Sequence, residues 1–344
     1  MPIKPKMKLG FLLCLGILFL IFGGLFFVAA SSLYIPAEKD GPSRVFMVPR
    51  GATLRQVVHK LEAEGITGES RMLLLWGKLM GYGTHIKAGE YRLNSGMPPV
   101  KILDTLLRGG TLTHNVTIPE GFTLAQIGSV LAEKGLADRD EFIALAKDPK
   151  IVRKYNLSGP SLEGFLFPDT YRFSRGLSSD VIIDTMVKRF HEVVDPLDEQ
   201  IKASGMRLSE VVTLASMVEK ETGLPRERPL IAGVFLNRLK RGMRLESDPT
   251  VIYGIAEFDG NLTRKDLKTP SPYNTYITRG LPPWPIANPG RDAILAVLQP
   301  EETDYLYFVS KNNGSHHFST SLKDHRHAVR QYQKSIPSLR RKTP

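Results

Sequence analysis

The sequence predicts an α+β protein with one apolar helix ahead of two folded domains. Three observations support this: an uncharged apolar run at residues 9–30, a strand–turn–helix pattern that occurs twice, and a helix-rich part from about residue 137. The 344 residues suffice for roughly two domains. We expect a small mixed domain at 44–113 and a larger mixed α/β domain at 114–335.

The apolar run at residues 9–30 is long enough to cross a lipid bilayer. At about 1.5 Å of rise per residue, its helix would extend roughly 33 Å. Three lysines lie within residues 1–8, and the next Lys or Arg is Lys39. The positive-inside rule therefore puts residues 1–8 in the cytoplasm and the domains outside. A cleaved signal peptide is the alternative, but the run exceeds the ~7–15 residues of a signal core, which favours a single-pass anchor.

The composition excludes several classes of function. The one cysteine, Cys14, lies in the apolar run, which excludes an internal disulfide framework, a Cys-rich metal centre and a thiol nucleophile outside the membrane. The chain has 46 Lys and Arg against 35 Asp and Glu. A domain outside the membrane meets little nucleic acid, so this charge favours anionic headgroups, an anionic cell wall or a solvated surface. No nucleic acid, metal or cofactor is expected.

A strand–turn–helix pattern occurs twice, at residues 48–57 and 118–127, with Pro, Gly, Thr, Leu and Gln at matching positions. Each copy predicts a short strand, a Pro-x-Gly turn, an N-cap at Thr53 or Thr123, and an amphipathic helix that ends at a glycine. Residues 88–93 are predicted as a returning strand. Residues 31–43, with two prolines, are predicted as a linker.

The first copy and the residues after it, across 44–113, resemble the LysM module. That module is a small βααβ fold that binds glycans containing N-acetylglucosamine. The resemblance rests on a strand, Pro-x-Gly, Thr-Leu-x-x-Val, two helices and a strand. It implies a LysM-like, glycan-binding subdomain. The alternative is a structural turn and cap that only positions the next domain.

The second half is predicted to be mainly helical around one rigid loop. Six prolines fall within residues 269–290, which excludes a continuous helix or central strand there, and such loops often border a cleft. A strand at 305–309 and a second at 317–319 are predicted to pair across an Asn-Asn-Gly turn. Residues 336–344 form a basic tail. Helices are predicted at 138–146, 178–204 with a break at Pro196, 208–222, 227–241, 294–298 and 322–335.

Residues 214–222 contain the carboxyl groups most suited to acid–base chemistry. On a helical wheel, Glu219 and Glu221 lie on opposite shoulders of the apolar stripe, so periodicity alone does not choose between them. Both lie near the end of the predicted helix, where the macrodipole and partial burial raise a carboxyl pKa. A general acid needs such a raised pKa to stay protonated near neutral pH. A solvated helix end is the alternative.

A series of motifs surrounds this segment: Leu-Glu-Gly-Phe-Leu-Phe-Pro-Asp-Thr-Tyr at 162–171, Ala-Ser-Met-Val-Glu-Lys-Glu-Thr at 215–222, Val-Phe-Leu-Asn-Arg-Leu at 234–239, Gly-Met-Arg-Leu-Glu-Ser-Asp-Pro-Thr-Val-Ile-Tyr-Gly at 242–254, Ser-Pro-Tyr-Asn-Thr-Tyr at 271–276 and Tyr-Leu-Tyr-Phe-Val at 305–309. In order and spacing they resemble the endolytic murein transglycosylases, the MltG or YceG-like family. The resemblance implies a lytic transglycosylase, a lyase on the periplasmic side of the inner (cytoplasmic) membrane. It would cleave the β-1,4 bond between N-acetylmuramic acid and N-acetylglucosamine of nascent peptidoglycan and leave a 1,6-anhydromuramoyl end.

The resemblance also implies that Glu219 is the catalytic residue. As general acid it protonates the glycosidic oxygen, the muramoyl 6-hydroxyl attacks the anomeric carbon, and Glu219 then removes that hydroxyl proton. Peptidoglycan strands, the membrane and peptidoglycan synthases are the implied partners. Candidates for substrate contact are Glu163, Asn237, Asp248, Tyr253, Tyr273, Asn274 and Asn288, with Trp284 in the proline-rich loop as a further candidate.

Two other functions remain open from the sequence. A two-carboxylate hydrolase (muramidase) would pair Glu219 with Glu163, Asp248 or Glu221. A membrane-tethered scaffold that binds glycan without cutting it would rest on the LysM-like repeat.

Overall fold

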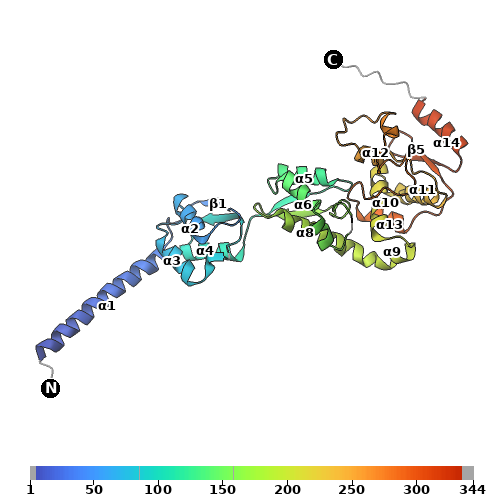
Figure 1. The fold of residues 1–344 in the computed structure, drawn as a ribbon. Helices are drawn as coiled ribbons and strands as arrows, with labels where there is room; N and C mark the ends of the chain where they lie inside the picture. The colour runs from blue at the N-terminus through green and yellow to red at the C-terminus, as the bar shows by residue number, and fades with distance from the viewer. Residues whose placement is uncertain (1–4, 85, 158, 335–344) are drawn as a thin grey trace, which may run out of the picture. The chain divides into compact units, whose positions relative to one another are not determined.

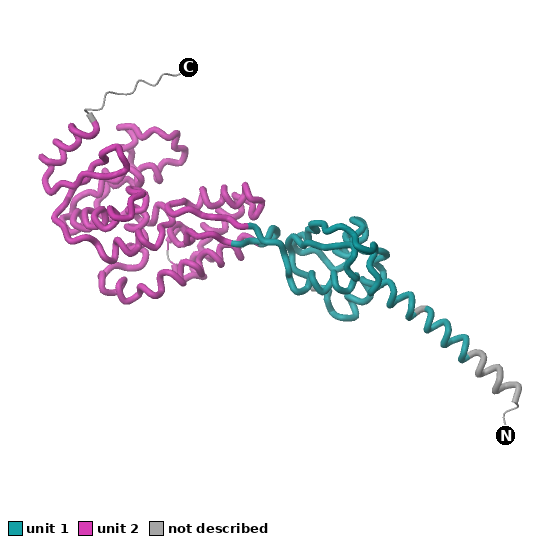
Figure 2. The backbone as a smooth tube through the Cα atoms, turned by 180° about the vertical axis from the view of Figure 1, so that it is seen from behind, with its two compact units in different colours: residues 1–114, 172–177 teal, residues 115–171, 178–344 magenta. Residues whose placement is uncertain are grey.

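The computed structural model describes residues 5–84, 86–157 and 159–334 (Figure 1). The chain forms two compact units (Figure 2). Unit 1 comprises residues 1–114 and 172–177, and unit 2 comprises residues 115–171 and 178–344. The mixed α and β elements agree with the predicted class.

Unit 1 begins with the apolar helix α1 (Pro5–Tyr34). Its segment Leu15–Tyr34, with a mean hydropathy of 2.2, is long and apolar enough to cross a membrane. The helix continues through residues 31–34, which the sequence assigned to the linker, because its last turn has a packing partner. Leu33 lies in a buried apolar cluster of unit 1.

The rest of unit 1 has the predicted βααβ order, followed by one more helix. Strands β1 and β2 pair antiparallel, with Phe46 opposite Tyr91, and both of these side chains are fully buried. The helix α4 was not predicted, and it completes the core with Ile102 and Leu106. The elements are β1 (Ser43–Val48), α2 (Leu54–Ala63), α3 (Arg71–Leu79), the 3-10 turn η1 (Tyr82–Thr84), β2 (Gly89–Asn94) and α4 (Pro99–Arg108).

The two copies of the repeat fold alike. Thr53 caps α2 and Thr123 caps α5 (Leu124–Glu133), each accepting a hydrogen bond from the backbone N–H three residues on. The glutamines at those positions, Gln56 and Gln126, accept in return from the threonine N–H at 2.9 Å. These reciprocal capping boxes fix where each helix starts, which confirms the predicted caps.

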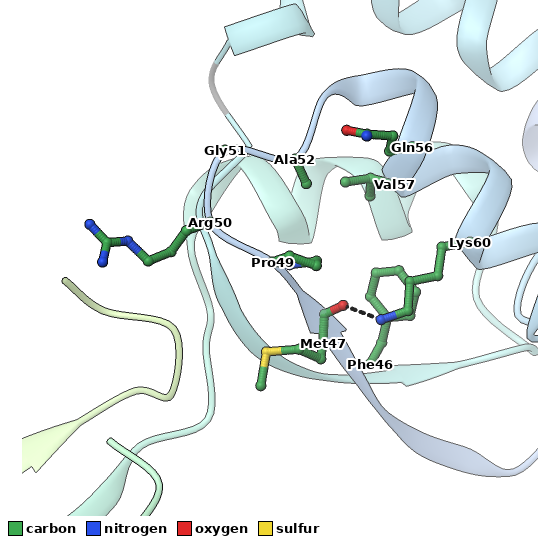
Figure 3. Close-up of a pocket in the computed structure, with 9 residues that line it drawn as sticks. All are labelled: Phe46, Met47, Pro49, Arg50, Gly51, Ala52, Gln56, Val57 and Lys60. Carbon is green, nitrogen blue, oxygen red and sulfur yellow. Dashed lines mark hydrogen bonds between the residues drawn. The ribbon is translucent and has the colours of Figure 1, made fainter. Parts of the chain in front are cut away.

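A cavity of about 260 Å³ lies at the Pro-x-Gly turn of unit 1 (Figure 3). Gly51 adopts a φ of 71° there, a conformation that glycine reaches without a steric penalty. Lys60 lies over the Phe46 ring at 5.0 Å and donates to the Met47 carbonyl at 2.6 Å. Arg50 is exposed at the mouth, so the cavity combines an apolar floor with positive charge.

The centre of unit 2 is α10 (Leu208–Glu221), whose residues 211–218 are all buried. It packs against α11 (Arg228–Lys240), α12 (Asp248–Tyr253) and α13 (Arg291–Leu298) (Figure 1). The hairpin of β5 (Tyr307–Ser310) and β6 (His316–Ser319) packs on α11 and α14 (Leu322–Val329). The other elements are β3 (His114–Thr117), α6 (Arg139–Ala146), α7 (Pro149–Lys154), β4 (Thr170–Phe173), α8 (Ser179–Val194), η2 (Asp195–Leu197), α9 (Asp198–Ser204), η3 (Pro225–Glu227), η4 (Asp266–Lys268) and the π-helical turn η5 (Arg330–Lys334).

Most predicted elements of unit 2 are confirmed. The long helical pattern breaks at Pro196, where η2 separates α8 from α9. Residues 269–290 contain no helix or strand, as their prolines indicated. The first strand of the hairpin starts at Tyr307 rather than at residue 305. The last predicted helix ends as α14 and η5, and its residue 335 lies outside the described residues.

Candidate active site

Helix α10 presents Glu219 and Glu221 from its last turn to two different surroundings. The helix is buried from Val211 to Val218, so its carboxyl groups lie at its two ends: Glu210 in the first turn, and Glu219 and Glu221 in the last. The two side chains take separate partners, as the helical wheel indicated. What distinguishes them is the structure that packs on each side.

Glu219 is held in a buried ion pair. One carboxylate oxygen accepts from Arg228 at 2.8 Å and the other from the Gly290 N–H at 3.0 Å. The exposed fractions of the Glu219 and Arg228 side chains are 5% and 8%. The pKa of Glu219 is raised overall: burial and the negative charge of Glu120 raise it, and the Gly290 N–H and Arg228 lower it in part. Arg228 also donates to Glu120 at 3.0 Å.

Gly290 leaves room for Glu120 beside this ion pair. A Cβ atom at residue 290 would lie 1.9 Å from a carboxylate oxygen of Glu120, so a side chain there would displace the Glu120 carboxylate that Arg228 binds. The surroundings of Glu219 are thus filled by protein groups that neutralise and hold its carboxylate.

Glu221 faces a cavity of about 470 Å³. Ser247 donates its hydroxyl to the Glu221 carboxyl group. The pKa of Glu221 is raised to about 7 by all contributions together. Burial and the negative charge of Asp248 raise it, while the Ser247 hydroxyl and the Arg238 charge lower it. A carboxyl group with this pKa is largely protonated just below neutral pH, as a general acid must be.

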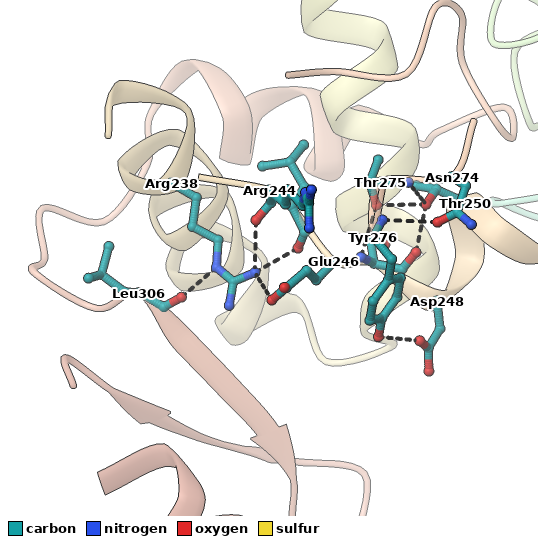
Figure 4. Close-up of polar contacts among 11 residues, drawn as sticks. Arg238, Arg244, Glu246, Asp248, Thr250, Asn274, Thr275, Tyr276 and Leu306 are labelled. Atoms are coloured by element: carbon teal, nitrogen blue, oxygen red, sulfur yellow. Dashed lines mark hydrogen bonds and ion pairs between the residues drawn. The ribbon is translucent and has the colours of Figure 1, made fainter. Parts of the chain in front are cut away.

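The walls of this cavity are mainly polar and come from several helices, strands and loops of unit 2. Arg238 on α11 is fixed by bonds to the carbonyls of Leu306 and Leu245, at 2.6 Å and 2.9 Å, and to Glu246 at 3.2 Å (Figure 4). The other lining residues that bear on the argument are Asp248 on α12, Tyr276 in the proline-rich loop, His316 on β6 and His325 on α14.

Two further pairs order the cavity wall. The Tyr276 hydroxyl donates to Asp248 at 2.6 Å (Figure 4). His316 Nδ1 lies 2.7 Å from a carboxylate oxygen of Glu227, and its backbone N–H donates to the other oxygen at 3.0 Å. Both pairs fix side chains that would otherwise rotate, so the cavity is preorganised.

Glu163 belongs to a different, fully buried network. Its carboxylate accepts from the Leu124 N–H at 3.0 Å, from Asn288 at 2.9 Å and from the Tyr253 hydroxyl at 3.2 Å. Burial raises its pKa to about 7. Asn288 also accepts from the backbone N–H groups of Gly164 and Leu166. The structure thus brings together three predicted site residues, but their polar atoms bond one another and the backbone.

The remaining candidates are spread over the unit. Asn237 donates to the Thr303 carbonyl at 2.6 Å, away from the Glu221 cavity. Asn274 is completely buried and donates to three carbonyls of its own loop. Tyr273 packs on Tyr253 with ring centroids 4.9 Å apart. Trp284 is 7% exposed and donates to the Ser161 carbonyl, so it anchors the proline-rich loop.

Sequence reasoning did not select Ser247, Arg238, Tyr276 or His316 as site residues. The first three lie within the quoted motifs at 234–239, 242–254 and 271–276. Their place in these motifs was the sequence signal that could have identified them. His316 lies outside these motifs. Among the described residues, no group of three or more His, Cys, Asp or Glu side chains is arranged to hold a metal ion.

A mixed α/β domain that holds a carboxyl group of pKa near 7 against a preorganised polar cavity has the features of an acid–base enzyme. The chain belongs to the YceG-like family, whose model matches residues 46–331. This match covers most of both units.

Named relatives agree with this family. The chain is 34% identical over 330 residues to an endolytic murein transglycosylase of Bacillus subtilis, covering 91% of each chain. It is 32% identical to an endolytic murein transglycosylase of Streptococcus pneumoniae, covering 84% of this chain and 58% of that one. A crystal structure of a YceG-like protein from Listeria monocytogenes matches with a TM-score of 0.59 and 32% identity, covering 84% of this chain and 99% of that one.

Proposed function

We propose that this chain is an endolytic murein transglycosylase, a lyase that cuts within peptidoglycan glycan strands. The names of its relatives support this activity. The observation that carries the proposal is Glu221, a carboxyl group with a pKa of about 7 that lines a polar cavity. The cleaved bond is the β-1,4 link between N-acetylmuramic acid and N-acetylglucosamine, and the product has a 1,6-anhydromuramoyl end.

We assign the general acid to Glu221, where the family resemblance pointed to Glu219. A carboxylate bonded to a guanidinium and a backbone N–H is held by two donors that favour its charged form and that already occupy one acceptor position on each oxygen. Glu219 is in that state. Glu221 has one neutral hydroxyl partner and an open cavity in front of it. Glu219 stays the alternative, and a pair of matched variants separates the two.

One carboxyl group serves both proton transfers. Glu221 gives its proton to the glycosidic oxygen as the bond from that oxygen to the anomeric carbon breaks. The muramoyl 6-hydroxyl oxygen then bonds to the same carbon, and its proton passes to the Glu221 carboxylate, which restores the acid. Because the nucleophile is tethered to the reacting sugar, no water needs activation. Asp248 contributes negative charge to the same cavity, which favours an oxocarbenium-like transition state.

Product analysis tests the reaction class. We expect the full-length chain to convert uncrosslinked glycan strands into fragments whose muramoyl ends are lighter by one water than a reducing end, as measured by mass spectrometry. Asp248 shares the cavity with Glu221, so a two-carboxylate muramidase is the specific competitor. Reducing ends would support that hydrolase, and intact strands would support the non-enzymatic scaffold.

The apolar helix α1 supports membrane anchoring. We propose that it crosses the cytoplasmic membrane once, with residues 1–8 in the cytoplasm and the chain after α1 on the other side, beside the wall that is being synthesised. The span Leu15–Tyr34 has the length and hydropathy that this requires. The positive charge ahead of it sets the orientation.

Unit 1 is proposed to be a LysM-like subdomain that binds glycan. Its βααβ order and antiparallel strand pair support this, and the cavity at the Pro-x-Gly turn offers a site (Figure 3). Among the lining residues, Met47 and Ala52 are partly exposed and supply apolar surface, and the exposed Arg50 and Gln56 supply polar groups. Sugars are commonly bound by such a combination of apolar surface and hydrogen-bonding groups.

Charge reversal at the mouth of this cavity should separate binding from cutting. We expect Arg50→Glu to weaken retention on purified sacculi while the rate on short glycans stays the same. The matched control is Arg55→Glu, since Arg55 is also exposed but does not line the cavity. Equal retention of the two variants and the unchanged chain in a co-sedimentation assay would leave unit 1 with a structural role.

A further inference from the structure

Unit 1 has an apolar groove between α1 and α3. It has a volume of about 300 Å³, and every side chain that lines it is apolar or aromatic. The groove runs along the last part of the apolar helix and along one face of α3. Its lining residues are Phe26, Ala29, Ala30, Leu33, Tyr34, Met72, Leu75, Trp76 and Leu79.

Helix α3 exposes apolar side chains in addition to those that it buries. One side packs into the core of unit 1 through Leu73 and Gly77, both of which are buried. The other side exposes Leu75 by 48% and Leu79 by 74%, with Met80 at 46% just beyond the helix. Soluble domains rarely leave large neighbouring apolar side chains in water without a binding partner.

The position of α3 along α1 identifies the environment of this face. From Phe26 to Tyr34 the helix rises roughly 12 Å, and this stretch is the C-terminal end of the apolar span. In a bilayer of about 30 Å hydrocarbon thickness, that depth reaches from the headgroups into the acyl chains of one leaflet. A helix packed against this stretch therefore enters the same region.

We propose that α3 lies in the membrane interface and that its groove with α1 holds an acyl chain of a phospholipid. This inference rests on the proposed anchoring of α1. Its main support is that α3 and the end of the apolar span line one groove, so the exposed apolar face of α3 continues the apolar surface of α1. Tyr34 and Trp76 lie at the level where aromatic side chains gather in membrane proteins. Lys78 in the last turn of α3 is exposed, and its charge favours anionic headgroups.

The consequence for function is that unit 1 rests on the lipid surface. Burial of Leu75, Leu79 and Met80 in the membrane interface adds to the membrane affinity that α1 provides, and it fixes the orientation of unit 1 against the membrane. The glycan cavity at its Pro-x-Gly turn would then lie at a set distance from the bilayer.

The chain has two tryptophans, and one of them reports directly on the groove. Trp76 lines it, whereas Trp284 is buried in the core of unit 2. We expect acyl chains brominated near the headgroup to quench Trp76 emission when the full-length chain is reconstituted in phosphatidylethanolamine–phosphatidylglycerol vesicles. Chains brominated near the methyl end should quench it less. In Trp76→Phe the quenching should be lost.

A matched pair of surface variants tests the face itself. Leu75→Glu with Leu79→Glu should reduce the quenching to the level of Trp76→Phe. Val45→Glu should leave it unchanged, since Val45 is 57% exposed on β1 but does not line the groove.

Two results would overturn the inference. One is unquenched Trp76 in vesicles from which alkaline carbonate does not extract the chain, because α1 would then be anchored without lipid in the groove. The other is a blue-shifted but unquenched Trp76 emission, which means that protein, such as a second copy of α1, fills the groove. Extraction of the chain by carbonate would instead refute the proposed anchor, and the groove would then lose its lipid as well.

Discussion

Glu221→Gln is expected to lower the turnover of glycan strands by ~10³-fold or more. Removal of a general acid or base typically costs ~10²–10⁴-fold, and this carboxyl group serves in both proton transfers. Glutamine keeps the shape of the side chain and can still accept from Ser247, so the fold should persist. The rate of anhydro product formation under saturating substrate, measured beside the unfolding midpoint, checks both expectations.

Glu219→Gln is the matched control, two residues away on the same helix. It breaks the buried pair with Arg228, and the loss of one partner from a buried ion pair costs about 3 kcal/mol. We therefore expect a lower free energy of unfolding, with most of the catalytic rate kept per folded molecule. If Glu219→Gln abolishes the product and Glu221→Gln retains it, Glu219 is the acid and our assignment is wrong. Full activity in both variants would direct attention to Glu163.

Asp248→Asn is expected to shift the alkaline limb of the pH–rate profile to lower pH. The negative charge of Asp248 raises the pKa of Glu221, so its removal lowers that pKa. The acid is active only while protonated, and its proton is then lost at a lower pH than the value of about 7 in the unchanged chain. The variant should lose some activity at every pH, because the charge that favours the transition state is gone, and should lose several-fold more above pH 7 than well below it.

A surface variant separates this local effect from a general change in charge. Asp304→Asn removes the same charge from an exposed position of unit 2, and Asp304 does not contribute to the pKa of Glu221. Its profile should coincide with that of the unchanged chain. An unshifted limb in Asp248→Asn would show that another group controls the alkaline side.

Local patterns predicted the main elements because those patterns act over a few residues. Thr53 and Thr123 cap helices through partners three residues away, and Pro196 ends α8 by its own backbone chemistry. The six-residue helix α12 was missed because it is shorter than two helical turns and shows no periodicity. Helix α4 was missed although it contributes to the core of unit 1.

The choice between the two glutamates depends on contacts distant in sequence. The wheel placed them on equal shoulders, whereas the structure brings Gly290 to one and Ser247 to the other. The type of polar residue did not identify the ligand-binding residues either. Asn274 has the side chain of a sugar-binding residue, yet its amide already donates to three nearby backbone carbonyls. Only the folded chain shows which polar groups remain for a ligand.

The packing of Leu33 links anchoring to folding. Leu33 ends the apolar helix and also packs with Leu54, Leu73 and Leu103 in the interior of unit 1. A protease that shed the domains by cutting just after Tyr34 would leave that site open, and exposing one leucine site costs about 1.5–3 kcal/mol. If α1 is the anchor proposed above, the shed form would keep the cavity of unit 2 but have a less stable unit 1. Shedding would then weaken the proposed glycan-binding part before it affected the catalytic part.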